Sequence, residues 1–246
     1  MRIPRIHVAT PLPPGELLQL PEQAGEHLVR VLRLETGHPL ILFNGDGHEV
    51  DARLATVARR AVTAELLARR ECSRESPLSL TLAQSIARGE KMDWILQKAT
   101  ELGVARIVPV VTERTEVRLD EDRAGKRLAH WQQVVASACE QCGRTELPEI
   151  ATPQKLMHWC ASLGAADTAA RFALLPDADV GLREIGPLNQ GALLLIGPEG
   201  GLSEQDIAIA RNAGFRGLRL GPRILRTETA GLAALAALQA VAGDFT

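Results

Sequence analysis

The sequence of 246 residues contains no tyrosine and only seven other aromatic residues, three tryptophans and four phenylalanines. An extended surface that stacks many nucleic-acid bases needs aromatic rings, so such a platform is not expected. Cysteine is also rare, at four residues, which excludes a small protein held together by disulfides. The hydrophobic content of 46% and the charged content of 24% exclude an intrinsically disordered chain and are typical of a globular protein.

Long apolar runs are absent as well. Residues 229–243 carry no charge, but they are mostly alanine and number about 15, fewer than the roughly 20 apolar residues of a membrane span. Near the start, Pro11, Pro13 and Pro14 stand where a secretory signal would be apolar. We therefore expect a protein without a membrane anchor, located in the reducing cytoplasm.

The net charge is −2, from 28 basic and 30 acidic residues, so the surface as a whole is not a polycation. Of the basic residues, 24 are arginines, whose planar guanidinium suits phosphate and base recognition; a GC-rich genome would produce the same bias. Residues 206–226 hold a local basic patch, which could contact RNA or be an ordinary solvated surface. Its arginines, set against the single acidic residue Asp206, are Arg211, Arg216, Arg219, Arg223 and Arg226.

The chain divides into two predicted domains, residues 1–72 and 73–246, at a short charged segment that ends in proline. The first domain is mostly β and is expected to form a small barrel or curled sheet, with a strong turn signal at Asp46-Gly47. Its predicted elements are a helix at 26–34, with Leu28, Val31 and Leu32 facing inward, and strands at 39–44, 48–55 and 61–67.

From residue 78 onward, strands and helices alternate, which is typical of a mostly parallel sheet covered by helices. The second domain is therefore expected to have an α/β fold. Its predicted strands are 79–85, 106–111, 171–175, 192–196 and 217–220, and its predicted helices are 90–102, 122–142, 154–163, 203–213 and 227–241.

Two glycine-containing loops follow predicted strands, IGPEGGLS at 196–203 and LGPRILRTETA at 220–230. In α/β proteins, ligands bind at the carboxyl ends of parallel strands, where free backbone amides can face a small molecule. Neither G-x-G-x-x-G nor G-K-[ST] is present, so dinucleotide and triphosphate loops are not expected. The two loops could close over one ligand, or they could be tight turns that bind nothing.

These two loops resemble the signature loops of the RsmE-type ribosomal RNA methyltransferases, which belong to the SPOUT class of S-adenosylmethionine enzymes. The resemblance extends over nearly the whole chain. One departure is Cys142, where the family's pattern has a small hydroxyl residue. The other matching segments are residues 91–103 (the family's first helix), Glu140-Gln141 with Arg144 and Pro148 (its central motif), and His27-Leu28 with Val31-Leu32-Arg33 (a helix of its PUA-like RNA-binding domain).

The resemblance implies a PUA-like β-barrel at 1–72 and a SPOUT α/β domain at 73–246, whose C-terminal chain forms a trefoil knot. Knots are nearly absent from other folds. It also implies a homodimer with the active site near the subunit interface. The last helix could approach a partner chain closely or pack tightly within its own chain, because it is rich in small residues: Ala230, Gly231, Ala233, Ala234, Ala236 and Ala237.

The implied reaction is transfer of the methyl group of S-adenosylmethionine to N3 of a uridine in 16S ribosomal RNA, either free or within the small ribosomal subunit. This nitrogen carries a proton and is a poor nucleophile until the proton leaves. Arg144 and Arg226 are candidates for stabilising the developing anion or for holding a phosphate. Glu228 is the candidate base, with Glu140 in reserve, although an acidic residue in the first turn of a helix also stabilises that helix.

The cofactor is expected to be bound without a metal, by both loops and by the end of one strand. The predicted cofactor-binding residues are Leu175, Gly197, Glu199, Gly200, Gly201, Leu220, Gly221, Ile224 and Leu225.

Three other functions are weaker interpretations. Cys139, Cys142, His158 and Cys160 could suggest zinc, but two of them lie within a helix pattern, and buried thiols explain them better. A non-catalytic RNA-binding protein would lack a saturable S-adenosylmethionine site. A nucleotide-dependent enzyme would need the phosphate-binding motifs that the sequence lacks.

Overall fold

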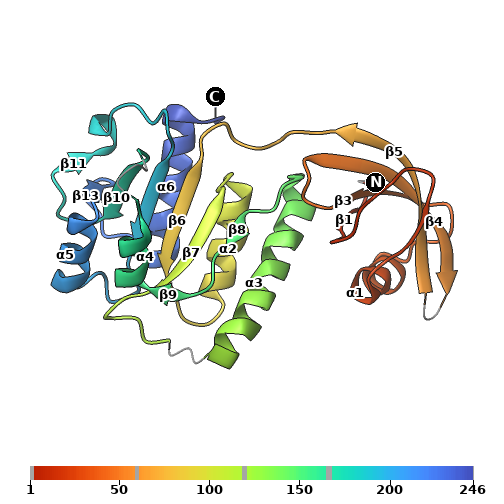
Figure 1. The fold of residues 1–246 in the computed structure, drawn as a ribbon, viewed down its shortest axis with the longest axis horizontal. Coiled ribbons are helices and arrows are strands. Elements are labelled where there is room, and N and C mark those ends of the chain that lie inside the picture. The colour runs from red at the N-terminus through yellow and green to blue at the C-terminus, as the bar shows by residue number, and fades with distance from the viewer. Residues whose placement is uncertain (1–2, 59–60, 118–120, 165–167, 246) are drawn as a thin grey trace. The chain divides into compact units, whose positions relative to one another are not determined.

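The computed structural model describes residues 3–58, 61–117, 121–164 and 168–245. The chain forms two compact units (Figure 1). The first contains Met1–Glu75 together with Ala136–Leu147, and the second contains Ser76–Val135 together with Pro148–Thr246. A segment from the middle of the chain, which includes the end of helix α3 (Glu121–Cys142), therefore belongs to the N-terminal unit.

The N-terminal unit is built on a five-stranded sheet in the order β1-β3-β4-β5-β2. β1 runs parallel to β3, and the remaining neighbours are antiparallel. The hairpin predicted around Asp46-Gly47 is confirmed, and its side chains Leu40, Leu42 and Leu54 are buried in the core. The strands are β1 (Arg5–His7), β2 (Leu17–Gln19), β3 (Pro39–Phe43), β4 (His48–Ala58) and β5 (Ala61–Glu71).

The predicted helix at 26–34 is displaced and partly wrong. The structure has helix α1 (Glu22–Glu26) followed by one π-helical turn, η1 (His27–Val31), in which the Leu32 N–H bonds to the His27 carbonyl. A π turn holds more residues than an α turn and so rotates the side chains that follow. Leu28 is fully buried as predicted, but Val31 is 66% exposed and Leu32 is 37% exposed, so these two do not face inward.

The second unit contains an eight-stranded sheet in the order β11-β13-β10-β12-β6-β7-β8, with β9 also paired to β7. All its strand pairs are parallel, as the alternating pattern predicts. Its strands are β6 (Leu80–Ser85), β7 (Arg106–Val111), β8 (Glu149–Ile150), β9 (Gln154–Lys155), β10 (Ala170–Leu174), β11 (Val180–Gly181), β12 (Ala192–Ile196) and β13 (Arg216–Arg219).

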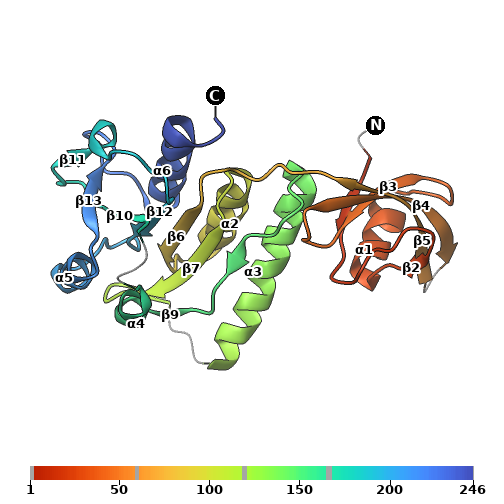
Figure 2. The same cartoon turned by 45° about the horizontal axis from the view of Figure 1, so that its top comes forward.

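Helices cover both faces of this sheet (Figure 2). α6 packs against α2, β6 and β12, whereas α4 packs against α5 and β7. Trp159 of α4 and Phe215 before β13 are buried together on the second face. The helices of this unit are α2 (Lys91–Glu101), the larger part of α3, α4 (Leu156–Ser162), α5 (Glu204–Asn212) and α6 (Thr227–Ala242), with a 3-10 turn, η2 (Leu182–Glu184).

Within the described part of the chain, no helix combines the length and the apolar character that crossing a bilayer requires.

Candidate cofactor pocket and active site

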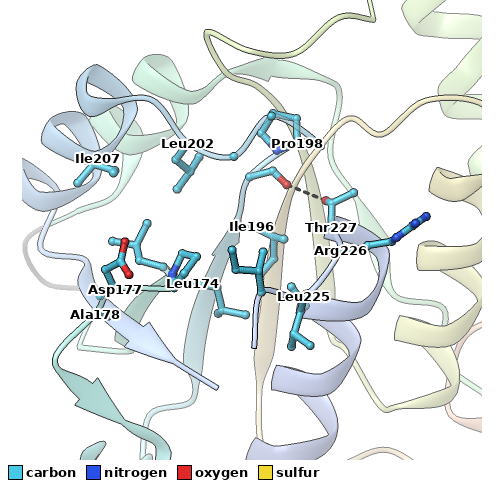
Figure 3. A pocket seen from close by; sticks show the side chains of 18 of the residues that line it. Leu174, Asp177, Ala178, Ile196, Pro198, Leu202, Ile207, Leu225, Arg226 and Thr227 are labelled. Carbon is cyan, nitrogen blue, oxygen red and sulfur yellow. Dashed lines mark hydrogen bonds between the residues drawn. The ribbon is translucent and has the colours of Figure 1, made fainter. Parts of the chain in front are cut away.

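A cavity of about 910 Å³ lies at the carboxyl ends of β10 and β12, beside the start of α6 (Figure 3). All of its lining residues belong to the second unit. Its apolar lining includes Leu174, Ile196, Leu202, Ile207 and Leu225, and charged side chains that line it are Lys91, Asp177, Asp179, Glu199, Arg211, Arg226 and Glu228.

The first loop, residues 197–203, folds back tightly on itself. A Cβ atom on Gly197 would lie 2.8 Å from the Leu202 nitrogen, so only glycine allows this approach. Arg114 Nη1 donates a hydrogen bond to the Gly200 carbonyl at 2.8 Å. Ser203 and Asp206 form the predicted N-cap of α5, each accepting a bond from the other's backbone N–H. The loop is therefore held at its middle, by Arg114, and at its last residue, by the cap of α5.

The second loop is tied directly to the first. Thr227, the first residue of α6, donates a hydrogen bond from Oγ1 to the Gly197 carbonyl at 2.7 Å (Figure 3). Leu225, two residues earlier, lines the same cavity near Ile196. The sequence left open whether the two loops close over one ligand or are tight turns that bind nothing. In the structure, both loops border a single cavity.

Lys91 lies between two carboxylates of the pocket. Its Nζ is 3.1 Å from Glu199 Oε1 and 3.6 Å from Glu228 Oε2. Burial raises the pKa of Glu199, but hydrogen bonds from its own backbone, from the Arg88 N–H and from Lys91 outweigh this and lower it. Glu228 Oε2 is buried and accepts no hydrogen bond from the residues that the structure describes. Lys91, at 3.6 Å, lies within ion-pair distance of this buried oxygen.

Most residues that the sequence predicts for the site line the cavity. Figure 3 shows the Arg226 side chain pointing away from the apolar residues. Leu220 and Gly221 instead line two other hollows, of about 820 Å³ and about 70 Å³, each of which shares Leu225 with the cavity. The predicted residues that line the cavity are Leu175, Gly197, Glu199, Gly200, Gly201, Ile224, Leu225, Arg226 and Glu228.

Lys91, Asp177 and the apolar Leu202 and Ile207 are not among the residues that the sequence predicts for the site. Lys91 is the first residue of the segment 91–103, which matches the family's first helix. The sequence therefore marked this segment but indicated no role for Lys91 in the site. Asp177 lies in the short loop after β10, where nothing in the sequence pattern marks it.

Arg144 and Glu140 belong to the N-terminal unit. Arg144 is only 6% exposed, and its Nε donates to Glu75 Oε2 at 2.7 Å. Glu140 Oε1 accepts a hydrogen bond from the His7 N–H at 2.9 Å, and burial raises the pKa of this carboxyl. Of the three predicted catalytic residues, Arg226 and Glu228 are among the residues that line the cavity, whereas the buried Arg144 is paired with Glu75 in the other unit.

The four cysteines are free thiols. Burial raises the pKa of Cys139 to about 12 and that of Cys160 to about 11, so both are uncharged at neutral pH. In the described ranges, no three His, Cys, Asp or Glu side chains are grouped so that they could hold a metal ion.

Comparison with known proteins gives two family matches. Residues 74–239 match the model of an RNA methyltransferase domain, and residues 20–67 match that of an RNA methyltransferase PUA domain. Ribosomal RNA small subunit methyltransferase E of Buchnera aphidicola subsp. Schizaphis graminum is 34% identical over 245 residues, 100% of this chain and 99% of that protein. The Bacillus subtilis protein of the same name is 30% identical, with coverage of 86% and 85%.

Among solved structures, a ribosomal RNA small subunit methyltransferase E from Neisseria gonorrhoeae, bound to S-adenosylmethionine, is 40% identical. It superposes with a TM-score of 0.94 and full coverage of both chains.

Proposed function

The chain belongs to the RsmE-type family of ribosomal RNA methyltransferases, and we propose that it transfers the methyl group of S-adenosylmethionine to N3 of a uridine in 16S ribosomal RNA. One observation of the structure carries this proposal. The two loops that match the family's signature motifs border one cavity, and a hydrogen bond from Thr227 to Gly197 joins them.

The residues of the cavity fit the cofactor. Leu174, Ile196 and Leu225 offer an apolar surface for the flat adenine ring. The Asp177 carboxylate can accept hydrogen bonds from ribose hydroxyls. Gly197, Gly200 and Gly201 line the cavity, so the loop offers backbone rather than side chains to a ligand at these positions. When bound, S-adenosylmethionine supplies an electrophilic methyl group on its sulfonium.

The residues predicted for the methyl-transfer step are one carboxylate and two arginines, and their proposed roles differ. The buried Glu228 Oε2, without a hydrogen-bond partner among the described residues, accepts the proton of uridine N3 in this proposal. Arg226 stabilises negative charge on the uracil oxygens or binds the flanking phosphate. The role proposed for Arg144 is the same, and it requires that this side chain exchange its ion pair with Glu75 for the RNA.

The fold and the oligomeric state that we propose are those of the family. The five-stranded sheet of the N-terminal unit closes into a PUA-like barrel that binds RNA, and the C-terminal chain around the cavity forms a trefoil knot. Two chains form a homodimer, and Ala233, Ala236 and Ala237, half-buried on α6, lie in the interface. The enzyme acts in the cytoplasm on RNA of the small ribosomal subunit, without a metal.

The decisive experiment is methyl transfer from radiolabelled S-adenosylmethionine to small subunits purified from a strain that lacks this enzyme. We expect label in 16S ribosomal RNA and 3-methyluridine in a nucleoside digest analysed by mass spectrometry. The variant Leu225→Arg, which places a cation in the apolar part of the cavity, should abolish transfer. Met157→Arg, at an exposed position of α4, is the matched control and should retain it.

A wild-type protein that bound RNA but not S-adenosylmethionine would contradict the proposal and favour a non-catalytic RNA-binding protein. Label in another nucleoside would retain the methyltransferase and refute the uridine N3 assignment. Running the assay in parallel on protein-free 16S ribosomal RNA decides which form of the substrate is used.

A further inference from the structure

We infer that Gln84 is a positioning residue that fixes the two cofactor loops relative to each other through Thr227, an inference that rests on the proposed function. Gln84 lies near the carboxyl end of β6, between β12 and β7 in the middle of the parallel sheet. Its side chain is fully buried, and it is not one of the residues that line the cavity.

In the hydrogen bonds around Gln84, each donor and each acceptor can be assigned. Its Nε2 donates to the Thr227 hydroxyl at 2.9 Å and to the Ser85 carbonyl at 3.0 Å. A hydroxyl has a single proton, and Thr227 uses it to donate to the Gly197 carbonyl at 2.7 Å. The amide of Gln84 therefore orients the Thr227 hydroxyl toward the first loop. The hydrogen bonds form a chain that runs from Gln84 through Thr227 to Gly197.

This chain connects the three segments that must keep their spacing around a bound cofactor. Gln84 belongs to β6, Gly197 begins the first loop directly after β12, and Thr227 lies in the second loop at the point where α6 begins. β6 is held on both sides by neighbouring strands, so it is a rigid reference for the two loops. The position of one loop is in this way transmitted to the other through the Thr227 side chain.

The packing around Gln84 indicates that the polar group has a role beyond filling the core. Its Oε1 is buried with no hydrogen-bond partner among the described residues, which costs free energy of folding. A Cβ on Gly231 of α6 would lie 3.3 Å from this oxygen, so glycine there makes room for the amide. An apolar side chain of similar size would avoid this cost, but it could not donate to Thr227.

The test is the affinity for S-adenosylmethionine, measured by isothermal titration for the wild type, Gln84→Met and Thr227→Val. Each variant removes one link of the chain with little change in side-chain volume. We expect each to weaken binding about tenfold, the effect of losing roughly one buried hydrogen bond. The double variant should be hardly weaker than the single ones, because both break the same chain. Thr227→Ser keeps the hydroxyl and should recover most of the affinity.

Gln239→Met is the matched control. Gln239 is also a fully buried glutamine of the second unit, and it bonds to the Leu102 carbonyl and to Ser76, away from the cavity. Urea unfolding of every variant separates stability from affinity. We expect Gln239→Met to lose stability without losing affinity.

Failure of the two proposals would look different. Wild-type protein that does not bind S-adenosylmethionine refutes the proposed function, and the positioning role with it. Wild-type binding together with unchanged affinity in Gln84→Met and Thr227→Val refutes the positioning role alone. Additive losses in the double variant also refute it, because independent effects would then explain both residues.

Discussion

At the scale of single residues, the charges of the pocket are arranged around Lys91. The ammonium contacts Glu199 at 3.1 Å and lies 3.6 Å from Glu228, which belongs to the start of a different element. Hydrogen bonds from its own backbone, from the Arg88 N–H and from Lys91 lower the pKa of the Glu199 carboxyl. Glu228 is less well provided with donors, since one of its oxygens accepts no hydrogen bond from a described residue. The two carboxylates therefore differ in their hydrogen bonding, and the proposed mechanism assigns the proton transfer to Glu228.

Replacing Glu228 with glutamine should lower the rate of methyl transfer about 10²- to 10⁴-fold, the usual contribution of a general base. The affinity for S-adenosylmethionine should change little, because the amide has nearly the same shape. Single-turnover transfer and isothermal titration measure the two quantities. Glu204→Gln, at an exposed position of α5, serves as the control. A rate within twofold of the wild type would show that Glu228 only stabilises the first turn of α6.

Glu140 has a raised pKa, caused mainly by burial and opposed by the His7 N–H, His27 and Arg5. A carboxyl with a raised folded-state pKa favours folding below its ordinary pKa of 4.5, and this contribution is lost as the pH rises through the folded-state value. Glu140→Gln keeps an acceptor for His7 and avoids the buried charge. The variant should therefore be more stable than the wild type at pH 7, with the difference closing as the pH falls toward 4.5.

Urea unfolding at a series of pH values between 4 and 7 measures this difference, with the exposed Glu16→Gln as the control in the same unit. A variant less stable than the wild type at pH 7 would mean that Arg5 and His27 favour the carboxylate more than burial opposes it. Loss of methyl transfer together with a gain in stability would instead support Glu140 as the reserve candidate for the base.

At the scale of elements, the π turn η1 decides which side chains the N-terminal unit exposes. It buries Leu28 and leaves Val31 and Leu32 on the surface beside Arg33. Arg33 follows the turn with a φ of 55°, the left-handed region that side chains other than glycine rarely adopt. A sequence pattern read with α-helical spacing could not predict this arrangement, because the extra residue of the π turn shifts every later position.

The strain at Arg33 can be measured by comparing two substitutions that remove the same charge. Arg33→Gly should be more stable than Arg33→Ala by about 1 kcal/mol, because glycine adopts positive φ without a Cβ clash. The difference in the free energy of urea unfolding between the two variants isolates the backbone term. Equal stability would indicate that the turn rearranges to negative φ once the arginine is gone.

At the scale of the whole molecule, the N-terminal unit is completed by a segment that the chain supplies more than sixty residues later. Arg5 Nη2 donates to the carbonyls of Gly143 and Arg144 at 3.2 and 3.0 Å, while Arg5 also pairs with the buried Glu49. Thr145 Oγ1 donates to the Cys72 carbonyl at 2.7 Å. Buried charges of this kind are costly unless they are paired, so the segment Ala136–Leu147 is an integral part of this unit.

Hydrogen exchange followed by mass spectrometry should show this directly. Amides of Ala136–Leu147 should exchange together with those of Met1–Glu75 when the protein is moderately destabilised by urea. Gly143→Ala should accelerate exchange in both segments, because Gly143 has a φ of 94° and its Cβ would lie 2.9 Å from Arg74 Nη1. Gly186→Ala, at a positive φ with open space around it, is the control. Exchange of the segment with the second unit alone would contradict the division.

The proposed homodimer also belongs to this scale. If α6 lies in the interface, Ala237→Glu should shift the sedimentation coefficient at micromolar concentration from that of a dimer to that of a monomer, because a buried, unpaired carboxylate opposes association. Ala240→Glu places the same charge on an exposed position of the same helix and should have no effect. A wild-type monomer at these concentrations would refute the dimer.

The alternation of strands and helices after residue 78, the hairpin at Asp46-Gly47 and the capping pair Ser203-Asp206 follow from local sequence signals, and the structure confirms them. Each depends on neighbouring residues alone: hydrophobic periodicity, turn chemistry or a side chain within reach of its own backbone. Local signals do not report where distant segments meet. The short strands β1 and β2 in the proline-rich start escaped prediction for this reason, since they are held by pairing with β3 and β5.

The sequence by itself determined the two loops, the kinds of side chain they carry and, through their resemblance to known motifs, the class of reaction. Only the tertiary structure decided that both loops border one cavity, that Lys91 lies between Glu199 and Glu228, and that Gln84 is bonded to Thr227. It also placed Arg144 in a buried ion pair with Glu75. These contacts join residues that are tens to more than a hundred positions apart. They depend on the order of strands in the sheet, which the periodicity of a single sequence does not encode.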